Sequence, residues 1–160
     1  AGEVYSNIDS MRARVNAARD VLVKSGRVDD KRVAAIGYCF GGSVALELAR
    51  SGADVKAIVA FHTSGLAAKN ADDNKKIKGE VLACNGAADP MSTRENVQAF
   101  RAAMEAAGVK CGIVNYEGAV HAFTNPEADS FNIPGVKYDA LADKASWEEM
   151  KKLFARTVGE

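Results

Sequence analysis

Residues 34–42 have the sequence AAIGYCFGG, an apolar run that ends in a glycine-rich turn. The residues from Lys31 to Ile36 predict a short buried strand, which Gly37 closes. The small residues from Ser43 to Arg50 predict a helix directly after the turn, with Gly52 behind it as a C-terminal stop. A strand, a glycine turn and a helix in this order are typical of an α/β protein.

The same alternation of helix and strand continues on both sides of this stretch. Before it, a helix is predicted by apolar residues at helical spacing, namely Ile8, Met11, Val15, Ala18 and Leu22. After it, further strands are predicted over residues 55–61, 80–84 and 109–116. A capping-box pattern from Ser92 to Glu95 opens the helix between the last two strands.

A last helix carries Trp147, Met150 and Phe154, whose spacing predicts core contacts. The strands show little polar alternation, which favours a sheet that helices cover on both faces. We therefore expect a doubly wound α/β fold with a mainly parallel sheet, and a single domain over residues 1–160.

Composition narrows the classes of function. The 160 residues are 48% hydrophobic and 26% charged, and 21 basic residues balance 21 acidic ones. A net charge of zero gives no broad electrostatic case for a nucleic-acid or anionic-membrane partner, and no apolar run is long enough to span a bilayer. The three cysteines lack C-x-x-C spacing, which favours reduced thiols in the cytoplasm over a disulfide framework or zinc site.

The glycine turn places Cys39 between the predicted strand and helix. A nucleophile on such a turn needs a strained backbone, and we expect the glycines at positions 37, 41 and 42 to leave the room for it. The start of the helix favours the thiolate, and the Phe40 N–H is one candidate oxyanion donor. The alternative is a buried cysteine in a glycine-rich turn that binds a phosphate or nothing.

Asp89 and His121 each follow a predicted strand. Because the carboxyl ends of parallel strands share one edge, we expect Cys39, Asp89 and His121 to meet there. Their order along the chain, nucleophile then acid then histidine, is that of the α/β-hydrolases. Taken separately, Asp89 could be only a helix N-cap and His121 an ordinary loop histidine.

Four stretches resemble dienelactone hydrolases, in the same order and with similar spacing: AAIGYCFGG, NGAADP, YEGAVHAF and YDALADKASWEEM. The resemblance implies an α/β-hydrolase fold and the hydrolysis of a small-molecule ester or lactone, without a metal or organic cofactor. It also implies that Cys39 is the nucleophile, that His121 is the base and that Asp89 orients the histidine. A thioacyl intermediate on Cys39 would then be hydrolysed by water.

Two departures from the family pattern limit this inference. Family members carry further chain before the first helix, and it supplies the outer strands, a second oxyanion donor and an acidic residue beside the thiol. Without those strands the edge at Lys31 to Ile36 would be open, which leaves association through that edge or a homo-oligomer as alternatives. The archetypal family member also has an arginine where this chain has Asn125, so we expect neutral esters or lactones rather than anionic ones.

Beyond the triad, the predicted oxyanion and substrate contacts are Tyr38, Phe40, His62, Phe123 and Asn125. His62 closes the second predicted strand beside the expected crevice, although a surface or capping histidine is an equal alternative. We expect Cys84 and Cys111 to be inert core thiols. Two other functions stay open, a redox-sensing protein built on Cys39 and a non-catalytic fragment or interaction module of the same fold.

Overall fold

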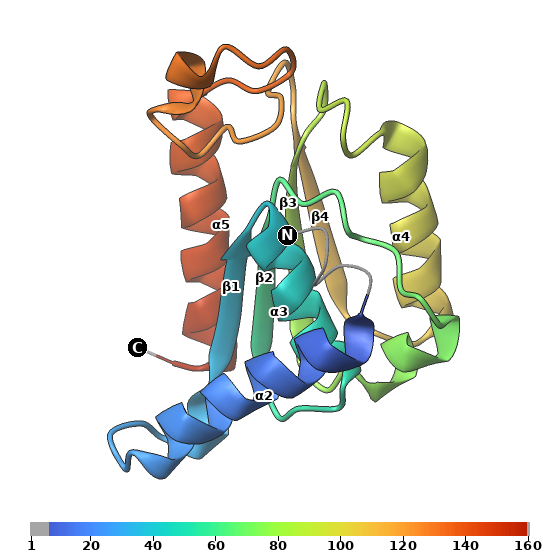
Figure 1. Ribbon diagram of the computed structural model, residues 1–160, viewed down its shortest axis with the longest axis vertical. Helices are drawn as coiled ribbons and strands as arrows, with labels where there is room; N and C mark the ends of the chain where they lie inside the picture. The colour runs from blue at the N-terminus through green and yellow to red at the C-terminus, as the bar shows by residue number, and fades with distance from the viewer. Residues whose placement is uncertain (1–6, 160) are drawn as a thin grey trace.

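The computed structural model describes residues 7–159, which form a four-stranded parallel sheet between helices (Figure 1). In chain order the elements are α2 (Ile8–Lys24), η1 (Asp30–Arg32), β1 (Ala34–Tyr38), α3 (Phe40–Arg50), β2 (Ala57–Phe61), η2 (Ala71–Lys76), β3 (Glu80–Gly86), α4 (Arg94–Ala106), β4 (Cys111–Tyr116), η3 (Ala128–Phe131) and α5 (Ala140–Thr157). The predicted α/β class with a mainly parallel sheet is confirmed. Within the described residues, no helix has the length and hydropathy that a membrane span needs.

The strands lie in the order β1-β2-β3-β4, and every neighbouring pair is parallel. β2 is buried along its whole length, as its continuous apolar sequence requires. All four strands therefore end at one edge of the sheet, and the loops that follow them gather there (Figure 1). In the described part of the chain β1 pairs with β2 alone, and the side chains of Ile36 and Tyr38 on it stay 43% and 39% exposed.

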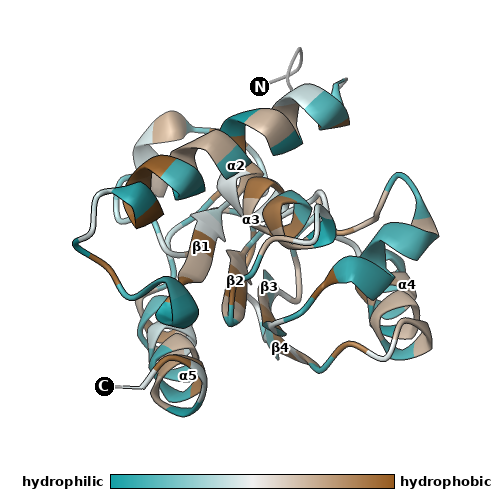
Figure 2. Ribbon diagram, turned by 90° about the horizontal axis from the view of Figure 1, so that it is seen from below, coloured by the Kyte–Doolittle hydropathy of each residue, from teal (hydrophilic) through white to brown (hydrophobic). Residues whose placement is uncertain are grey.

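Helices cover both faces of the sheet (Figure 2). On one face, α3 and α4 pack on strand residues such as Ile58 and Val81, and α2 lies outside α3. On the other face, α5 packs on residues such as Val59 and Leu82. Neighbouring residues of one strand thus serve opposite cores, because successive side chains on a strand point to opposite faces.

A buried ionic cluster ties α2, α3 and η2 together. Arg50 is 1% exposed and donates to Glu47 Oε1 and Asn74 Oδ1, both at 2.9 Å. Arg12 donates to Glu47 Oε2 at 2.8 Å and to Asp73 Oδ2 at 2.7 Å. Burial lowers the pKa of Arg50, while its bond to Glu47 opposes the shift. Removing one partner would leave a buried charge unpaired, which is energetically costly. The cluster therefore holds α3, the helix that begins beside Cys39, in its position against α2 and η2.

Every strand differs from its prediction by two or three residues at one end or both, and the two largest differences lie on either side of Cys39. The strand predicted from Lys31 begins at Ala34, because residues 30–32 form a 3-10 turn in which the Asp29 side chain accepts a hydrogen bond from the Lys31 N–H. The helix predicted from Ser43 begins at Phe40, which places Cys39 at its N-cap position. The turn between strand and helix is therefore tighter than the sequence indicated.

Three side chains also differ from their predicted roles. α4 is capped by Thr93, whose Oγ1 accepts from the Asn96 N–H at 3.4 Å, so the capping box predicted from Ser92 is wrong by one residue. Trp147 is 45% exposed and not a core contact, whereas Met150 is 3% exposed. Leu22, predicted on the apolar face of α2, is 47% exposed. In each case the spacing of apolar residues correctly predicted a helix. It did not predict which face of that helix the neighbouring elements cover.

Candidate active site

Cys39 lies in the turn between β1 and α3 with a strained backbone, at φ 51° and ψ −120°. Such a conformation costs about 1–3 kcal/mol for a residue with a Cβ. Two backbone hydrogen bonds hold it: the Cys39 N–H donates to Phe61 O at 2.9 Å, and the Gly42 N–H donates to Cys39 O at 3.1 Å. The turn aims the thiol away from the sheet, and Cys39 is exposed.

Two of the three glycines around Cys39 are required by close packing. A Cβ on Gly37 would lie 2.0 Å from Gly41 O, and a Cβ on Gly42 would lie 2.8 Å from Thr63 Cβ. A Cβ on Gly41 would meet no described atom within 4 Å outside its own helix. The expectation that all three positions need glycine is therefore wrong for Gly41, where the structure gives no packing reason.

The structure brings Cys39, His121 and Asp89 together at the carboxyl ends of β1, β4 and β3. His121 Nε2 lies 3.1 Å from Cys39 Sγ, and His121 Nδ1 lies 3.0 Å from Asp89 Oδ2. Asp89 and His121 are 3% and 4% exposed, so the polar chain runs from a buried carboxylate to an exposed thiol. Both distances lie within hydrogen-bonding range.

Each member of this chain is held by its own loop. The Met91 N–H donates to Asp89 Oδ1 at 2.7 Å, which leaves Oδ2 for His121. Because Thr93 caps α4, Asp89 is not the N-cap of that helix. The backbone of His121 is clamped by the segment after it, since its N–H donates to Gly135 O at 3.0 Å and its O accepts from the Lys137 N–H at 3.1 Å.

The two histidines of the site have opposite electrostatics. The hydrogen bond to Asp89 raises the pKa of His121, with burial opposing it and Cys39 adding to it. Burial, together with the nearby His121, lowers the pKa of His62 to about 4. At neutral pH His62 is therefore uncharged, whereas the raised pKa of His121 favours its protonated form.

His62 is 3% exposed, has a positive φ of 39° and lies beside Cys39 and His121 in the site. Its Nε2 lies 2.8 Å from Thr124 Oγ1, and its Nδ1 has no partner in the described residues. The ring meets His121 and Phe123 edge-on, at centroid distances of 5.2 and 5.3 Å. Thr124 is a site residue that the sequence did not single out, and its place close behind His121 is the signal that could have found it.

A cavity of about 660 Å³ opens beside Cys39 and His121. Its wall is largely apolar, with loop residues that the sequence did not identify: Met91, Ala122, Pro126, Phe131, Ile133 and Val136. Its other polar lining side chains are those of Tyr38, His62, Thr124, Asn125 and Asp143. No lysine or arginine of the described chain lines it, so this part of the site offers an anionic substrate no permanently charged partner.

The remaining predicted contacts fall into different places. Tyr38 lines the cavity and stacks on Phe61, with ring centroids 4.6 Å apart. Asn125 also lines it, and its Oδ1 accepts from the Glu127 N–H at 3.0 Å. Phe40 is the first residue of α3. The structure does not bring Phe123 to the cavity, because this residue is fully buried behind His62.

The other two cysteines differ from Cys39 in their surroundings. Cys84 is fully buried in β3 and Cys111 is half-buried in β4. Burial raises the pKa of each thiol to about 12, so both are protonated at neutral pH. Neither is placed to react readily with an oxidised Cys39, which weakens the redox-sensing alternative.

The parallel sheet, the strained turn before α3 and the loops at the carboxyl edge define the class of the α/β-hydrolases. Within that class the chain belongs to the dienelactone hydrolase family, whose model matches residues 2–158.

Some similar proteins are longer than this chain, and one has about the same length. A solved structure described as a dienelactone hydrolase-like promiscuous phosphotriesterase from metagenomic libraries is 41% identical, with a TM-score of 0.93, over 98% of this chain and 65% of that one. An uncharacterized Caenorhabditis elegans protein is 32% identical over 91% of this chain and 95% of its own. A Salmonella typhimurium protein whose name includes carboxymethylenebutenolidase is 32% identical over 82% of this chain and 49% of its own. The chain thus spans about half of this last relative.

Proposed function

We propose that the protein hydrolyses small carboxylic esters or lactones with Cys39 as the nucleophile. The observation that carries the proposal is the chain of two contacts, Cys39 Sγ to His121 Nε2 at 3.1 Å and His121 Nδ1 to Asp89 Oδ2 at 3.0 Å, at the wall of a cavity. A nucleophile, a base within reach and a carboxylate that orients the base are the parts that acyl transfer needs.

The steps follow from these positions. His121 Nε2 takes the thiol proton, and Asp89 fixes the tautomer and stabilises the imidazolium. Cys39 Sγ attacks the carbonyl carbon, with the Phe40 N–H as one donor to the oxyanion. The alcohol leaves with the proton from His121, and a thioacyl group remains on Cys39. Water then gives a proton to His121 and attacks the thioester, which releases the acid and restores the thiol.

The cavity wall favours uncharged substrates. Its lining is mostly apolar and lacks a cationic side chain in the described chain, and Asn125 and the Asp143 carboxylate lie in it. An anionic substrate would lose hydration there without gaining a charged partner. Neutral esters and lactones are therefore the proposed class.

Neutral phosphotriesters are a second candidate class. They are favoured by the 41% identity to a protein described as a promiscuous phosphotriesterase. A triester carries no charge, so it suits the same wall. The Cys39 thiolate would attack phosphorus instead of carbon, which breaks the bond from phosphorus to one ester oxygen, and the leaving alcohol or phenol would take its proton from His121. Comparing turnover of p-nitrophenyl acetate and paraoxon by one preparation ranks the two classes.

The test is turnover of p-nitrophenyl acetate by the wild type, Cys39→Ala and the control Cys111→Ala, which removes a thiol outside the site. We expect Cys39→Ala to abolish turnover and Cys111→Ala to keep it. Intact-mass spectrometry of the quenched wild type should show one acetyl group on Cys39. Equal turnover by Cys39→Ala, or no turnover of any ester by the wild type, would overturn the proposal; consumption of peroxide in place of esters would favour the redox alternative.

A further inference from the structure

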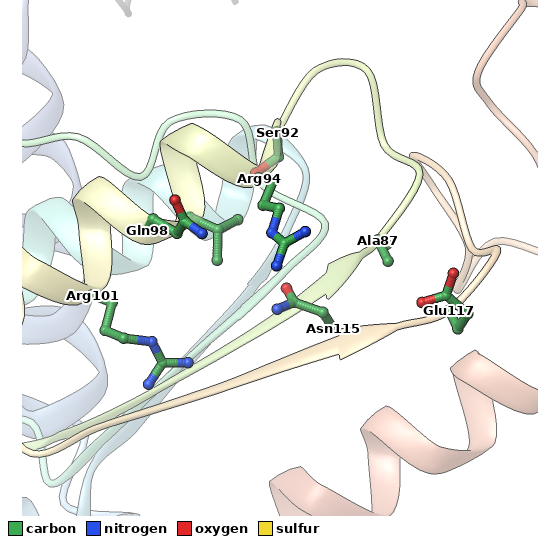
Figure 3. Close-up of a pocket in the computed structure, with 9 residues that line it drawn as sticks. Ala87, Ser92, Arg94, Gln98, Arg101, Asn115 and Glu117 are labelled. Atoms are coloured by element: carbon green, nitrogen blue, oxygen red, sulfur yellow. The ribbon is translucent and has the colours of Figure 1, made fainter.

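A second cavity of about 500 Å³ lies between α4 and β4 (Figure 3). It shares one loop with the triad: Ala87 and Ser92 line the second cavity, whereas Met91 lines the first. Its polar lining side chains are those of Ser92, Arg94, Gln98, Arg101, Asn115 and Glu117. The proposed hydrolysis uses none of these groups.

Two guanidinium groups dominate the charge of this cavity. Arg94 and Arg101 lie two turns apart on one face of α4, which corresponds to about 10 Å along the helix. In the described chain neither side chain makes a salt bridge or a side-chain hydrogen bond. Figure 3 shows Arg94 reaching from α4 toward Asn115 on β4, with Glu117 at the far end of the cavity.

Two buried polar groups beside these arginines lack partners. Ser92 is 3% exposed, and its Oγ has no hydrogen-bond partner in the described residues. Asn85 is fully buried on the neighbouring strand; its Nδ2 lies 3.5 Å from Asn115 Oδ1, and its own Oδ1 is unpartnered. Buried polar atoms of this kind are normally hydrogen-bonded. The Ser92 hydroxyl, which lines the cavity, is therefore available to a ligand there.

We propose that this cavity binds a small organic dianion such as a dicarboxylate. Each guanidinium meets one anionic group in a charge-assisted, bidentate contact. The Ser92 hydroxyl and the Asn115 amide donate to the oxygens between them. Two cations set two turns apart fit two separated anionic groups better than one compact anion. The volume lies within the range of about 300–1,000 Å³ that is usual for small-molecule sites.

The Glu117 carboxylate limits how many negative groups a ligand of this cavity can carry. It faces the end of the cavity away from the two arginines (Figure 3), where it disfavours a third negative group. The ligand also touches the loop that carries Asp89, since the Ser92 N–H donates to Asp89 O at 3.3 Å. Binding at this site does not depend on ester hydrolysis, so the two proposals can fail separately.

The test is a titration with glutarate, followed by calorimetry and by the NMR shifts of the Asn115 and Gln98 side-chain amides. Acetate and inorganic phosphate are the comparison ligands. We expect saturable glutarate binding at one site, weakened about tenfold or more in Arg94→Gln and in Arg101→Gln. Arg27→Gln is the matched control, because it removes the same charge from an exposed position outside the cavity.

Each other outcome overturns the proposal. Acetate or phosphate binding as tightly as glutarate would show that two separated anionic groups are not recognised. Equal weakening of glutarate binding in Arg27→Gln would show that the effect comes from the net charge of the protein and not from the cavity. Absence of saturable glutarate binding at millimolar concentrations would leave no site. Thermal unfolding of Arg94→Gln and Arg101→Gln checks that these exposed substitutions leave the fold intact.

Discussion

The two cavities that share the loop at residues 86–92 use their polar groups in opposite ways. In the first, Cys39, His121 and Asp89 are bonded to one another, and the surrounding wall is mostly apolar. In the second, Arg94 and Arg101 reach into open space without a partner in the described chain. In the first cavity the nucleophile, the histidine and the carboxylate are hydrogen-bonded to one another before anything binds, whereas the two arginines of the second cavity have no such partners among the described residues.

The difference shows how one loop can serve two purposes. Groups already aligned with each other need little rearrangement during a reaction, which suits bond making and breaking. Unpaired charges at a rim attract and select a charged ligand but hold no reacting atom in place. Experiments that disturb the alignment should therefore give larger effects than experiments that change the charge of a wall.

After the loss of Cys39 itself, the largest expected effect comes from Asp89→Asn. It removes the carboxylate that orients His121, and we expect kcat to fall about 10³–10⁴-fold. Because Asp89 raises the pKa of His121 and the base must be neutral to take a proton, activity should rise with pH through a midpoint above 6.5 in the wild type. That midpoint should move to lower pH in the variant. The matched control is Asp30→Asn on an exposed turn, and an unchanged kcat in Asp89→Asn would contradict the triad.

Selective thiol labelling should come next in size. Cys39 is exposed beside His121, whereas the pKa of Cys84 and of Cys111 is raised to about 12. Near neutral pH, iodoacetamide should therefore alkylate Cys39 at least about 100-fold faster than either of the others. Peptide mass spectrometry over time measures the three rates. Similar rates in the folded protein would show that the site does not activate its thiol.

A smaller effect is expected on stability in acid. The pKa of His62 is about 4 in the folded protein and 6.5 in the unfolded chain, so the unfolded state binds the proton first. Stability is therefore lost as pH falls from 6.5 toward 4, by on the order of 2 kcal/mol at pH 5. The raised pKa of His121 works the other way, contributing stability at low pH that is lost as pH rises.

The substitution His62→Gln isolates this contribution. We expect the difference in free energy of unfolding between pH 7 and pH 5 to change by about 2 kcal/mol in favour of the variant at the lower pH. Urea unfolding at the two pH values measures it. A difference that matches the wild type would mean that His62 already takes up its proton in the folded protein.

The smallest effect concerns the charge of the wall. The wild type should prefer neutral esters over anionic ones, because no cationic side chain of the described chain lines the cavity. Asn125→Arg should raise kcat/KM for an anionic ester about tenfold relative to a neutral one of the same size, with Asn125→Gln as the uncharged control. If the wild type already turns over the anionic ester best, another group must bind its charge.

The meeting of Cys39, Asp89 and His121 could be predicted from their positions along the chain, while their catalytic roles remain the proposal. Cys39, Asp89 and His121 each follow a strand, and parallel strands bring such positions to one edge. The lining of the cavity could not be predicted. Met91, Phe131 and other lining residues lie outside the α-helices and strands, where the sequence has no hydrophobic periodicity. The hydrophobic pattern of the sequence also does not indicate which of the predicted contact residues line the cavity and which lie behind it. His62 lines the cavity, whereas Phe123 packs against the His62 ring in the core.

The sheet was predictable for a similar reason, and its details were not. Apolar runs between glycines predicted every strand to within a few residues, and for β2 and β3 the cause is burial on both faces of the sheet. The exposure of Trp147 depends on what lies against one face of α5, which helical spacing does not encode. The choice of Thr93 over Ser92 as the N-cap depends on where the preceding loop ends and the helix begins. Local propensity cannot fix such one-residue choices.

The backbone of Cys39 has a consequence for how this residue persists through evolution. At φ 51° a glycine would sit without strain, so Cys39→Gly should fold at least as stably as the wild type although it has no thiol. In a library selected only for folding, glycine should accumulate at this position. A lineage that drifts without need of the sulfur would lose it by the same route. Cysteine at this position throughout a set of related sequences would therefore indicate selection for its thiol, because stability alone would favour its loss.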